Sequence, residues 1–166
     1  MEYSTADAPQ DLRDDDYVPA HLREVEEEPP PWPPNEIVPG IWQSGSPEPG
    51  EHWDAVIDLH GSAPPLEDVE FYVHWLIDDG PAPDFTTLKS LADLVDDFRA
   101  AGRRVLIHCA AGINRSGLLS AAALIRGGYD AEEAIDLVRE ARSGALNNPN
   151  FVELLRDPRW SPKSRS

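Results

Sequence analysis

Residues 105–126 constrain the fold of this chain more than any other segment. Val105–His108 is a short apolar run typical of a buried strand, and a short loop containing Gly112 follows it. The next segment, Ser116–Arg126, is apolar nearly all round, whereas a surface helix has only one apolar face. Such a helix must be surrounded by other elements. The sequence therefore predicts a strand–loop–helix unit at the centre of the molecule.

Strand-like and helix-like patterns alternate around this unit. Further strands are predicted at residues 36–43, broken into a hairpin at Pro39-Gly40, and at residues 55–59 and 71–77. Further helices are predicted over residues 88–98, after a capping pair formed by Asp130 and Glu133, and from Pro149 to Leu155. This alternation predicts an α/β architecture in which helices cover a central sheet.

The two ends of the chain differ from its middle. Residues 1–34 carry ten carboxylates against only Arg13 and Arg23, and they end in a proline-rich stretch. Such a segment buries too little apolar surface to offset its ordering entropy, so we expect a disordered leader, either solubilising or docking a partner. The predicted organisation is this leader, one domain over residues 35–157, and a basic polar tail over residues 158–166 that we expect to fray.

Charge and cysteine content exclude several functional classes. The chain has 14 Lys+Arg against 31 Asp+Glu, a net charge of −17, so we expect no broad binding to nucleic acid or to anionic membranes. Cys109 is the only cysteine, which excludes an intrachain disulfide framework and a multi-cysteine zinc site. The sequence has neither a membrane-spanning apolar run nor a secretory signal pattern, so a cytoplasmic location is expected.

The chemistry is concentrated between Cys109 and Arg115. Backbone N–H groups of a short loop before a helix converge on one point, and the helix N-terminus adds roughly half a positive charge. Arg115 can donate two parallel hydrogen bonds to two oxygens of a phosphate. Cys109 begins the loop, where the same positive field favours the thiolate. The segment thus predicts a phosphate-binding site that contains a nucleophile.

The order of residues in this segment matches a known motif, His-Cys-x5-Arg-Ser/Thr. It is formed by His108, Cys109, Arg115 and Ser116 around Ala110, Ala111, Gly112, Ile113 and Asn114. The motif resembles that of the cysteine-dependent protein tyrosine phosphatases, and over about residues 35–156 the chain is similar to their compact dual-specificity branch. The resemblance implies a dual-specificity phosphatase-like α/β fold with a central mixed sheet of about four to five strands flanked by helices. It also implies phosphate binding by the loop, without metal or cofactor.

The resemblance implies a role for each matching residue. Cys109 attacks phosphorus to form a phosphocysteine, while Arg115 and the loop amides hold the equatorial oxygens. Ser116 stabilises the departing thiolate, and His108 orders the loop. The other histidines lack metal-ligand spacing and are interpreted as ordinary surface or strand positions: His21, His52, His60 and His74.

A general acid must come from another loop, because a leaving alkoxide or phenolate needs a proton. Family members supply an aspartate about thirty residues before the cysteine, and Asp79, which precedes Gly-Pro, matches it. The neighbouring Asp78 is the alternative, whereas Asp84 is predicted to cap the next helix. Some relatives place the hydrolytic water with an asparagine. Asn148 is the candidate for that role here, although it also has the position of a helix cap.

The substrate class is the least constrained part of the prediction. Inositol-phosphate phosphatases of this superfamily tend to place lysines in the loop, where this chain has Ala110, Ala111 and Asn114, so a polyphosphorylated lipid is disfavoured. The predicted function is a protein phosphatase acting on phosphotyrosine, and also on phosphoserine or phosphothreonine if the pocket is shallow. An RNA 5′-triphosphatase, another non-protein phosphoester phosphatase, and a non-catalytic pseudophosphatase that binds phosphorylated residues stay as alternatives.

Overall fold

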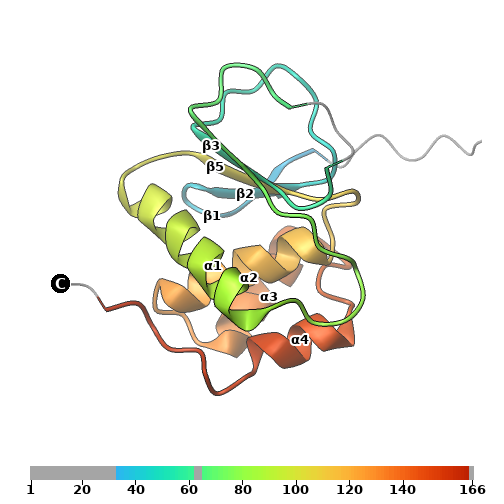
Figure 1. Cartoon of the computed structure of the whole chain (residues 1–166), viewed down its shortest axis with the longest axis vertical. Helices are drawn as coiled ribbons and strands as arrows, with labels where there is room; N and C mark the ends of the chain where they lie inside the picture. The colour runs from blue at the N-terminus through green and yellow to red at the C-terminus, as the bar shows by residue number, and fades with distance from the viewer. Residues whose placement is uncertain (1–32, 62–64, 165–166) are drawn as a thin grey trace, which may run out of the picture. The chain divides into compact units, whose positions relative to one another are not determined.

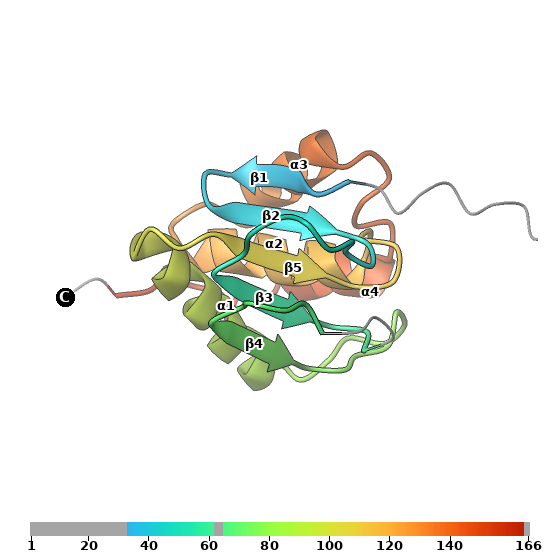
Figure 2. The same ribbon diagram turned by 90° about the horizontal axis from the view of Figure 1, so that it is seen from above.

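A computed structural model describes residues 33–61 and 65–164. Within these residues five strands form one sheet in the order β1-β2-β5-β3-β4. They are β1 (Asn35–Val38), β2 (Ile41–Ser44), β3 (Ala55–Asp58), β4 (Phe71–His74) and β5 (Val105–His108). Only β1 and β2 are antiparallel, so the sheet is mixed, as expected (Figures 1 and 2). Apart from Pro33 and Pro34, the predicted leader lies outside the described residues.

The helices lie on one face of this sheet (Figures 1 and 2). They are α1 (Phe85–Ala100), α2 (Arg115–Arg126), α3 (Ala131–Ala141) and α4 (Pro149–Leu155). The three predicted caps are confirmed: the side chains of Asp84, Asp130 and Asn148 each accept a backbone N–H of the first turn. In residues 33–61 and 65–164, no helix has both the length and the apolar character needed to cross a membrane.

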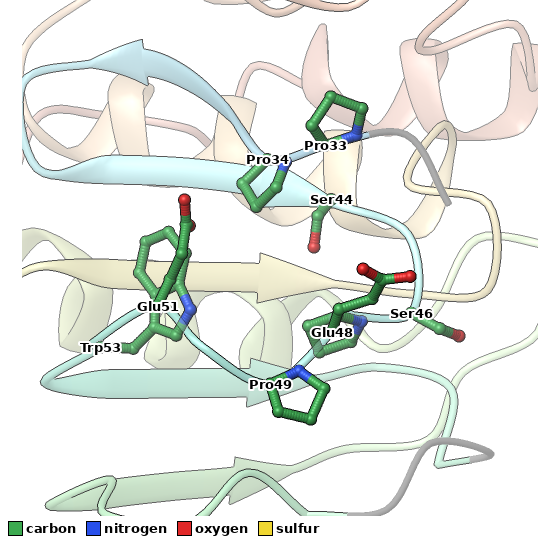
Figure 3. Close-up of a pocket in the computed structure, with 9 residues that line it drawn as sticks. Pro33, Pro34, Ser44, Ser46, Glu48, Pro49, Glu51 and Trp53 are labelled. Carbon is green, nitrogen blue, oxygen red and sulfur yellow. The ribbon is translucent and has the colours of Figure 1, made fainter. Parts of the chain in front are cut away.

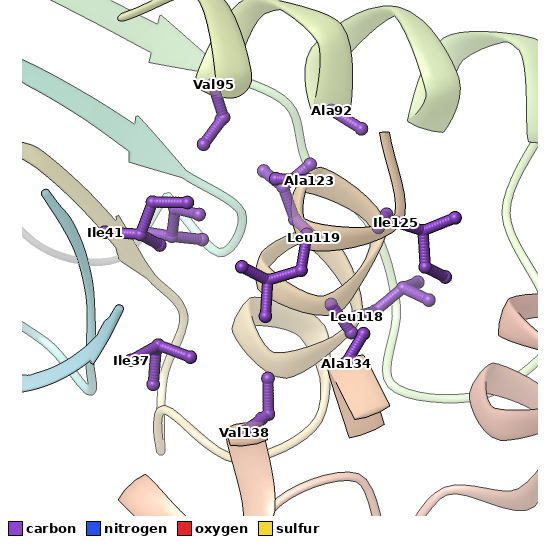
Figure 4. Packing of buried hydrophobic residues seen from close by; sticks show 14 of the residues in the cluster. Ile37, Ile41, Ala92, Val95, Leu118, Leu119, Ala123, Ile125, Ala134 and Val138 are labelled. Atoms are coloured by element: carbon purple, nitrogen blue, oxygen red, sulfur yellow. The ribbon is translucent and has the colours of Figure 1, made fainter. Parts of the chain in front are cut away.

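Helix α2 is the centre of the fold, as its all-round apolar surface predicted. Every residue of α2 after Arg115 is buried. Figure 4 shows α2 between Ala92 and Val95 of α1, on one side, and Ala134 and Val138 of α3. Full burial stabilises a large aliphatic side chain by about 1.5–3 kcal/mol, and this packing fixes the direction in which the start of α2 points.

The two faces of the sheet are covered differently. Ile41, Ile57 and Ile107 lie in the core beneath the helices. Their neighbours point to the opposite face because strand side chains alternate, and there Val56 and Leu106 form a smaller cluster with Trp53. Loops rather than helices cover this second face (Figure 1).

Strand β4 is shorter than predicted, and the tail contacts the helices. Strand β4 ends at His74 instead of residue 77, opposite Asp58, the last residue of β3. The Trp75 N–H and the Ile77 N–H still donate to Asp58 O and Leu59 O. In the tail, the Trp160 indole packs on Phe85 with ring centroids 4.7 Å apart, and its Nε1–H donates to Leu154 O at 2.7 Å. The Lys163 N–H donates to Arg126 O at 2.8 Å. These contacts tie residues 160 and 163 to the helices, and fraying of the tail stays a prediction.

Candidate active site

The C-terminal ends of the four parallel strands meet at one edge of the sheet. Ser44 and Asp58 both lie opposite His108 in the register, and His74 lies opposite Asp58. The loops that follow these strands therefore start side by side. Open α/β sheets bind ligands at this edge, so the chain order brings the predicted site residues to the expected place.

The cysteine loop (residues 109–115) curls over the Cys109 sulfur. The side chain of Cys109 is buried, the Gly112 N–H donates to Sγ at 3.2 Å, and Ser116 Oγ lies 3.2 Å from the same atom. Helix α2 begins at Arg115, so the positive end of its dipole is at this loop. Ala110 and Ala111 are exposed and Ile113 is half-buried. The sulfur thus lies at the base of a loop that presents hydrogen-bond donors to it.

The outer side of the cysteine loop is held by two side chains that the sequence did not single out. Gly112 O accepts hydrogen bonds from Gln43 Nε2 at 2.9 Å and from Arg142 Nε at 2.6 Å. Arg142, which is buried, also donates to Ala111 O at 3.3 Å and to Asn35 Oδ1 at 2.8 Å. Burial lowers the pKa of Arg142, and the charge of Cys109 opposes that shift. These bonds engage the carbonyls of Ala111 and Gly112, whereas the Gly112 N–H donates to the sulfur.

The acid loop (residues 75–84, between β4 and α1) lies against the cysteine loop. The carboxyl group of Asp79 accepts one hydrogen bond on each oxygen, from Asn148 Nδ2 at 2.8 Å and from Asn114 Nδ2 at 3.0 Å. The alternative, Asp78, makes no hydrogen bond or ion pair with another described residue. The amide of Asn148, the candidate for placing water, is thus directed to the acid loop.

Arg115, which begins α2 after the cysteine loop, contacts the segments that follow β3 and β4. Its Nη1 donates to His60 Nδ1 at 2.9 Å and to Ile77 O at 3.3 Å, so one nitrogen of the guanidinium is held at the acid loop. His60, which the sequence indicated as an ordinary surface or strand position, thus contacts the arginine of the motif. No spacing in the sequence could reveal this contact, which arises because β3 lies beside β5 and both end at the same edge.

A buried polar group lies beneath the loop. Asp58 accepts hydrogen bonds from the N–H groups of His60 and Gly61 at 2.9 and 2.8 Å and from Tyr72 Oη at 3.1 Å. Burial alone raises the pKa of Asp58, but these bonds and the nearby His108 ring hold the pKa below its usual value. Burial lowers the pKa of His108, and the charge of Asp58 offsets this only in part. Burial and Asp58 raise the pKa of Tyr72 to about 12. Within the described residues, no cluster of three metal-ligating side chains is present.

A groove of about 240 Å³ opens beside the cysteine loop (Figure 3). It adjoins the loop because the Ser46 N–H donates to Ala110 O at 3.3 Å. Glu48 and Glu51 are exposed at this groove, whereas Trp53 forms part of its floor and is buried. The full lining is Pro33, Pro34, Ser44, Ser46, Pro47, Glu48, Pro49, Glu51 and Trp53.

Comparisons with known proteins point to one family. The family model of the dual specificity phosphatase catalytic domain matches residues 61–159. Protein tyrosine phosphatase type IVA 3 of Homo sapiens is 36% identical over 95 residues, which make up 56% of this chain and 53% of the relative. The chain therefore spans about half the length of that relative.

Solved structures agree with this match. The structure of Tk-PTP in its active form has a TM-score of 0.65 and 29% identity, covering 75% of this chain and 95% of its own. The structure of human DUSP28 has a TM-score of 0.68 over 75% of this chain and 90% of its own, and at 21% identity this likeness shows the fold alone. Because the family model covers more than half of the chain and includes both the cysteine loop and the acid loop, this chain belongs to the dual specificity phosphatase branch of the cysteine-dependent protein tyrosine phosphatases.

Proposed function

We propose that this protein is a cysteine-dependent protein phosphatase that hydrolyses phosphotyrosine, with phosphoserine and phosphothreonine as further substrates. The observation that carries the proposal is the convergence on one sulfur: the Gly112 N–H and the Ser116 hydroxyl both lie 3.2 Å from Cys109 Sγ. Asp79 stands on the neighbouring loop, where its carboxyl group contacts Asn114 of the cysteine loop. A nucleophile and a proton donor are thus provided by adjacent loops.

The proposed reaction has two steps. In the first, Cys109 Sγ attacks phosphorus, the S–P bond forms, and the bond from phosphorus to the leaving oxygen breaks while Asp79 gives that oxygen its proton. In the second, Asp79 accepts a proton from water as the water oxygen attacks phosphorus, and the S–P bond breaks to release inorganic phosphate. The donors from Gly112 and Ser116 stabilise the sulfur when it leaves as a thiolate.

Arg115 and the loop amides are the proposed phosphate ligands. One guanidinium nitrogen of Arg115 is engaged with His60 and Ile77, and the other N–H donors remain to bind phosphate oxygens. The positive charge of Arg115 and the α2 dipole supply the positive field that a metal ion supplies in metal-dependent phosphatases. His108 is proposed to order the loop from below, next to Asp58.

Charge favours a phosphoprotein over the alternative substrates. An RNA 5′-triphosphate or a polyphosphorylated lipid carries several negative charges, whereas this chain has a net charge of −17 and exposes Glu48 and Glu51 beside the cysteine loop. The proposed nucleophile is active only as a reduced thiol, which favours a reducing compartment such as the cytoplasm.

The test is hydrolysis of an aryl phosphate by the full chain, followed by a panel of phosphotyrosine, phosphoserine, phosphothreonine, phosphoinositide and triphosphate-RNA substrates. We expect vanadate-sensitive turnover that is lost in Cys109→Ser, with phosphotyrosine peptides as the best macromolecular substrates. Retained turnover in Cys109→Ser contradicts the mechanism. A folded wild-type chain that binds phosphopeptides without hydrolysing them identifies the pseudophosphatase instead.

A further inference from the structure

Three asparagine side chains converge on the backbone and carboxyl group of Asp79-Gly80. Asn148 Nδ2 donates both to Asp79 Oδ1 at 2.8 Å and to Gly80 O at 3.1 Å. Asn150 Nδ2 donates to Gly80 O at 3.0 Å, and Asn114 Nδ2 donates to Asp79 Oδ2 at 3.0 Å. Both carboxyl oxygens and the next carbonyl are therefore held by neutral amide donors.

The two asparagines that touch the carboxyl group are themselves fixed in orientation. The Asn114 Oδ1 accepts the Asn148 N–H at 3.0 Å, which directs its Nδ2 to Asp79. The Asn148 Oδ1 accepts the Asn150 N–H at 3.0 Å as the cap of α4, which directs its Nδ2 to the acid loop. Both side chains are buried, at 8% exposure. Neither amide can turn without taking the side-chain acceptor from a backbone N–H, which is buried in the case of Asn148 and partly buried in the case of Asn150.

We infer that Asn114 and Asn148 act as positioning residues that seat the general acid Asp79 against the cysteine loop. We call this pair the asparagine clamp, and the inference rests on the proposed function. An arginine or lysine at these positions would place a counter-charge beside Asp79 and favour the carboxylate. Neutral amides orient the group without placing a full counter-charge beside it. Each carboxyl oxygen has two acceptor sites, so one per oxygen stays available toward the substrate.

The clamp joins three segments that are far apart in the sequence. Asn114 belongs to the cysteine loop, Asn148 precedes α4, and Asp79 belongs to the acid loop. The clamp therefore sets the position of the proton donor relative to the sulfur, which is the geometry on which general-acid catalysis depends.

The dependence of the rate on the leaving group distinguishes positioning of the general acid from a structural role. A phenolate of low basicity leaves without a proton, whereas an alkoxide or a basic phenolate needs one. Asn148→Ser keeps a side-chain oxygen that caps α4 equally well but lacks the amide donor. With Asn148→Ser we expect kcat/KM, which reports the first step, to fall about tenfold to a hundredfold for a phosphate ester with a poor leaving group and to change less than about threefold for one with a good leaving group.

The double variant and the folded state complete the test. In an Asp79→Ala background, Asn148→Ser is expected to have no further effect on either substrate, because the group that it positions is gone. Circular dichroism should show an unchanged thermal midpoint for Asn148→Ser. Equal losses of kcat/KM on both substrates, or a loss that persists in the Asp79→Ala background, would assign Asn148 a structural role and overturn the clamp. Failure of the wild-type chain to hydrolyse either substrate would instead overturn the proposed function.

Discussion

Gly112 occupies a crowded backbone position in the cysteine loop. Its φ of +69° is in the left-handed region, and an added Cβ would lie 2.3 Å from Ser44 C and 2.4 Å from Gly45 N. Both neighbours are backbone atoms, of the last residue of β2 and of the residue that follows it, so they cannot turn aside. We predict that Gly112→Ala abolishes aryl phosphate hydrolysis and lowers the free energy of unfolding by more than about 2 kcal/mol.

Gly144 provides the matched control. Its φ of +82° carries the same backbone strain, but no atom of the described residues lies within 4 Å of the added Cβ. Gly144→Ala is expected to cost about 1 kcal/mol from strain alone and to retain activity. Denaturant unfolding and an aryl phosphate assay compare the two variants. Equal losses in both would show that contact with Ser44 is not what requires glycine at position 112.

Local spacing was enough to predict the residues of the cysteine loop. Cys109, Arg115 and Ser116 come from one strand–loop–helix unit, so their arrangement follows from a short stretch of sequence. The partners His60 and Arg142 could not be predicted this way, because each lies more than twenty residues from the atoms that it contacts. Their contacts exist only after β3 and α3 have been placed around β5 and α2.

At the scale of elements, Arg142 ties the end of α3 to the cysteine loop and to β1. Its guanidinium donates to Gly112 O, Ala111 O and Asn35 Oδ1 from a buried position. We predict that Arg142→Met lowers the free energy of unfolding by about 2–4 kcal/mol, because buried acceptors lose their donors, and that it also reduces turnover. Arg142→Lys should recover only part of the loss, because an ammonium cannot reproduce the planar fork.

Arg139 on the same helix is the control for Arg142. It is exposed and makes one hydrogen bond, from Nη2 to Leu146 O at 2.9 Å. Arg139→Met should change the free energy of unfolding by less than about 1 kcal/mol, as measured in denaturant. A loss as large as that of Arg142→Met would mean that α3 itself, rather than its link to the loop, is what the substitution disturbs.

The titratable side chains at the ends of β3, β4 and β5, beneath the cysteine loop, predict that the stability of the fold depends on pH. Burial lowers the pKa of His108 below its ordinary 6.5, while Asp58, His60 and His74 act on the same ring. The unfolded chain therefore binds a proton at this histidine at pH values where the folded chain does not. The stability that this contributes is complete above about pH 6.5 and is lost as the pH falls below it.

Urea unfolding at several pH values measures this effect. We expect the free energy of unfolding to decrease between about pH 6.5 and 5 with a contribution of up to about 1.4 kcal/mol per pH unit from His108. His108→Asn, which cannot titrate, should flatten this part of the profile. An identical slope in wild type and His108→Asn would show that another group controls acid stability.

The whole molecule carries a net charge of −17, and the acidic groove places part of this charge next to the cysteine loop. The negative charge of the protein therefore repels a negatively charged phosphoester, unless basic residues flank the phosphorylated residue in the substrate. We predict that phosphotyrosine peptides with basic flanks have a several-fold higher kcat/KM at low ionic strength than peptides with acidic flanks. Added salt should reduce the difference, because it screens exposed charges separated by more than about 10 Å at 0.1 M.

Two variants with the same change in net charge separate the groove from the field of the whole molecule. Glu48 lies in the groove beside the cysteine loop, whereas Glu70 precedes β4 at the opposite edge of the sheet and pairs with Arg103. Glu48→Gln is expected to reduce the preference for basic flanks clearly, and Glu70→Gln to leave it nearly unchanged, because screening restricts the effect to nearby charges. An equal reduction in both variants would assign the preference to the net charge alone.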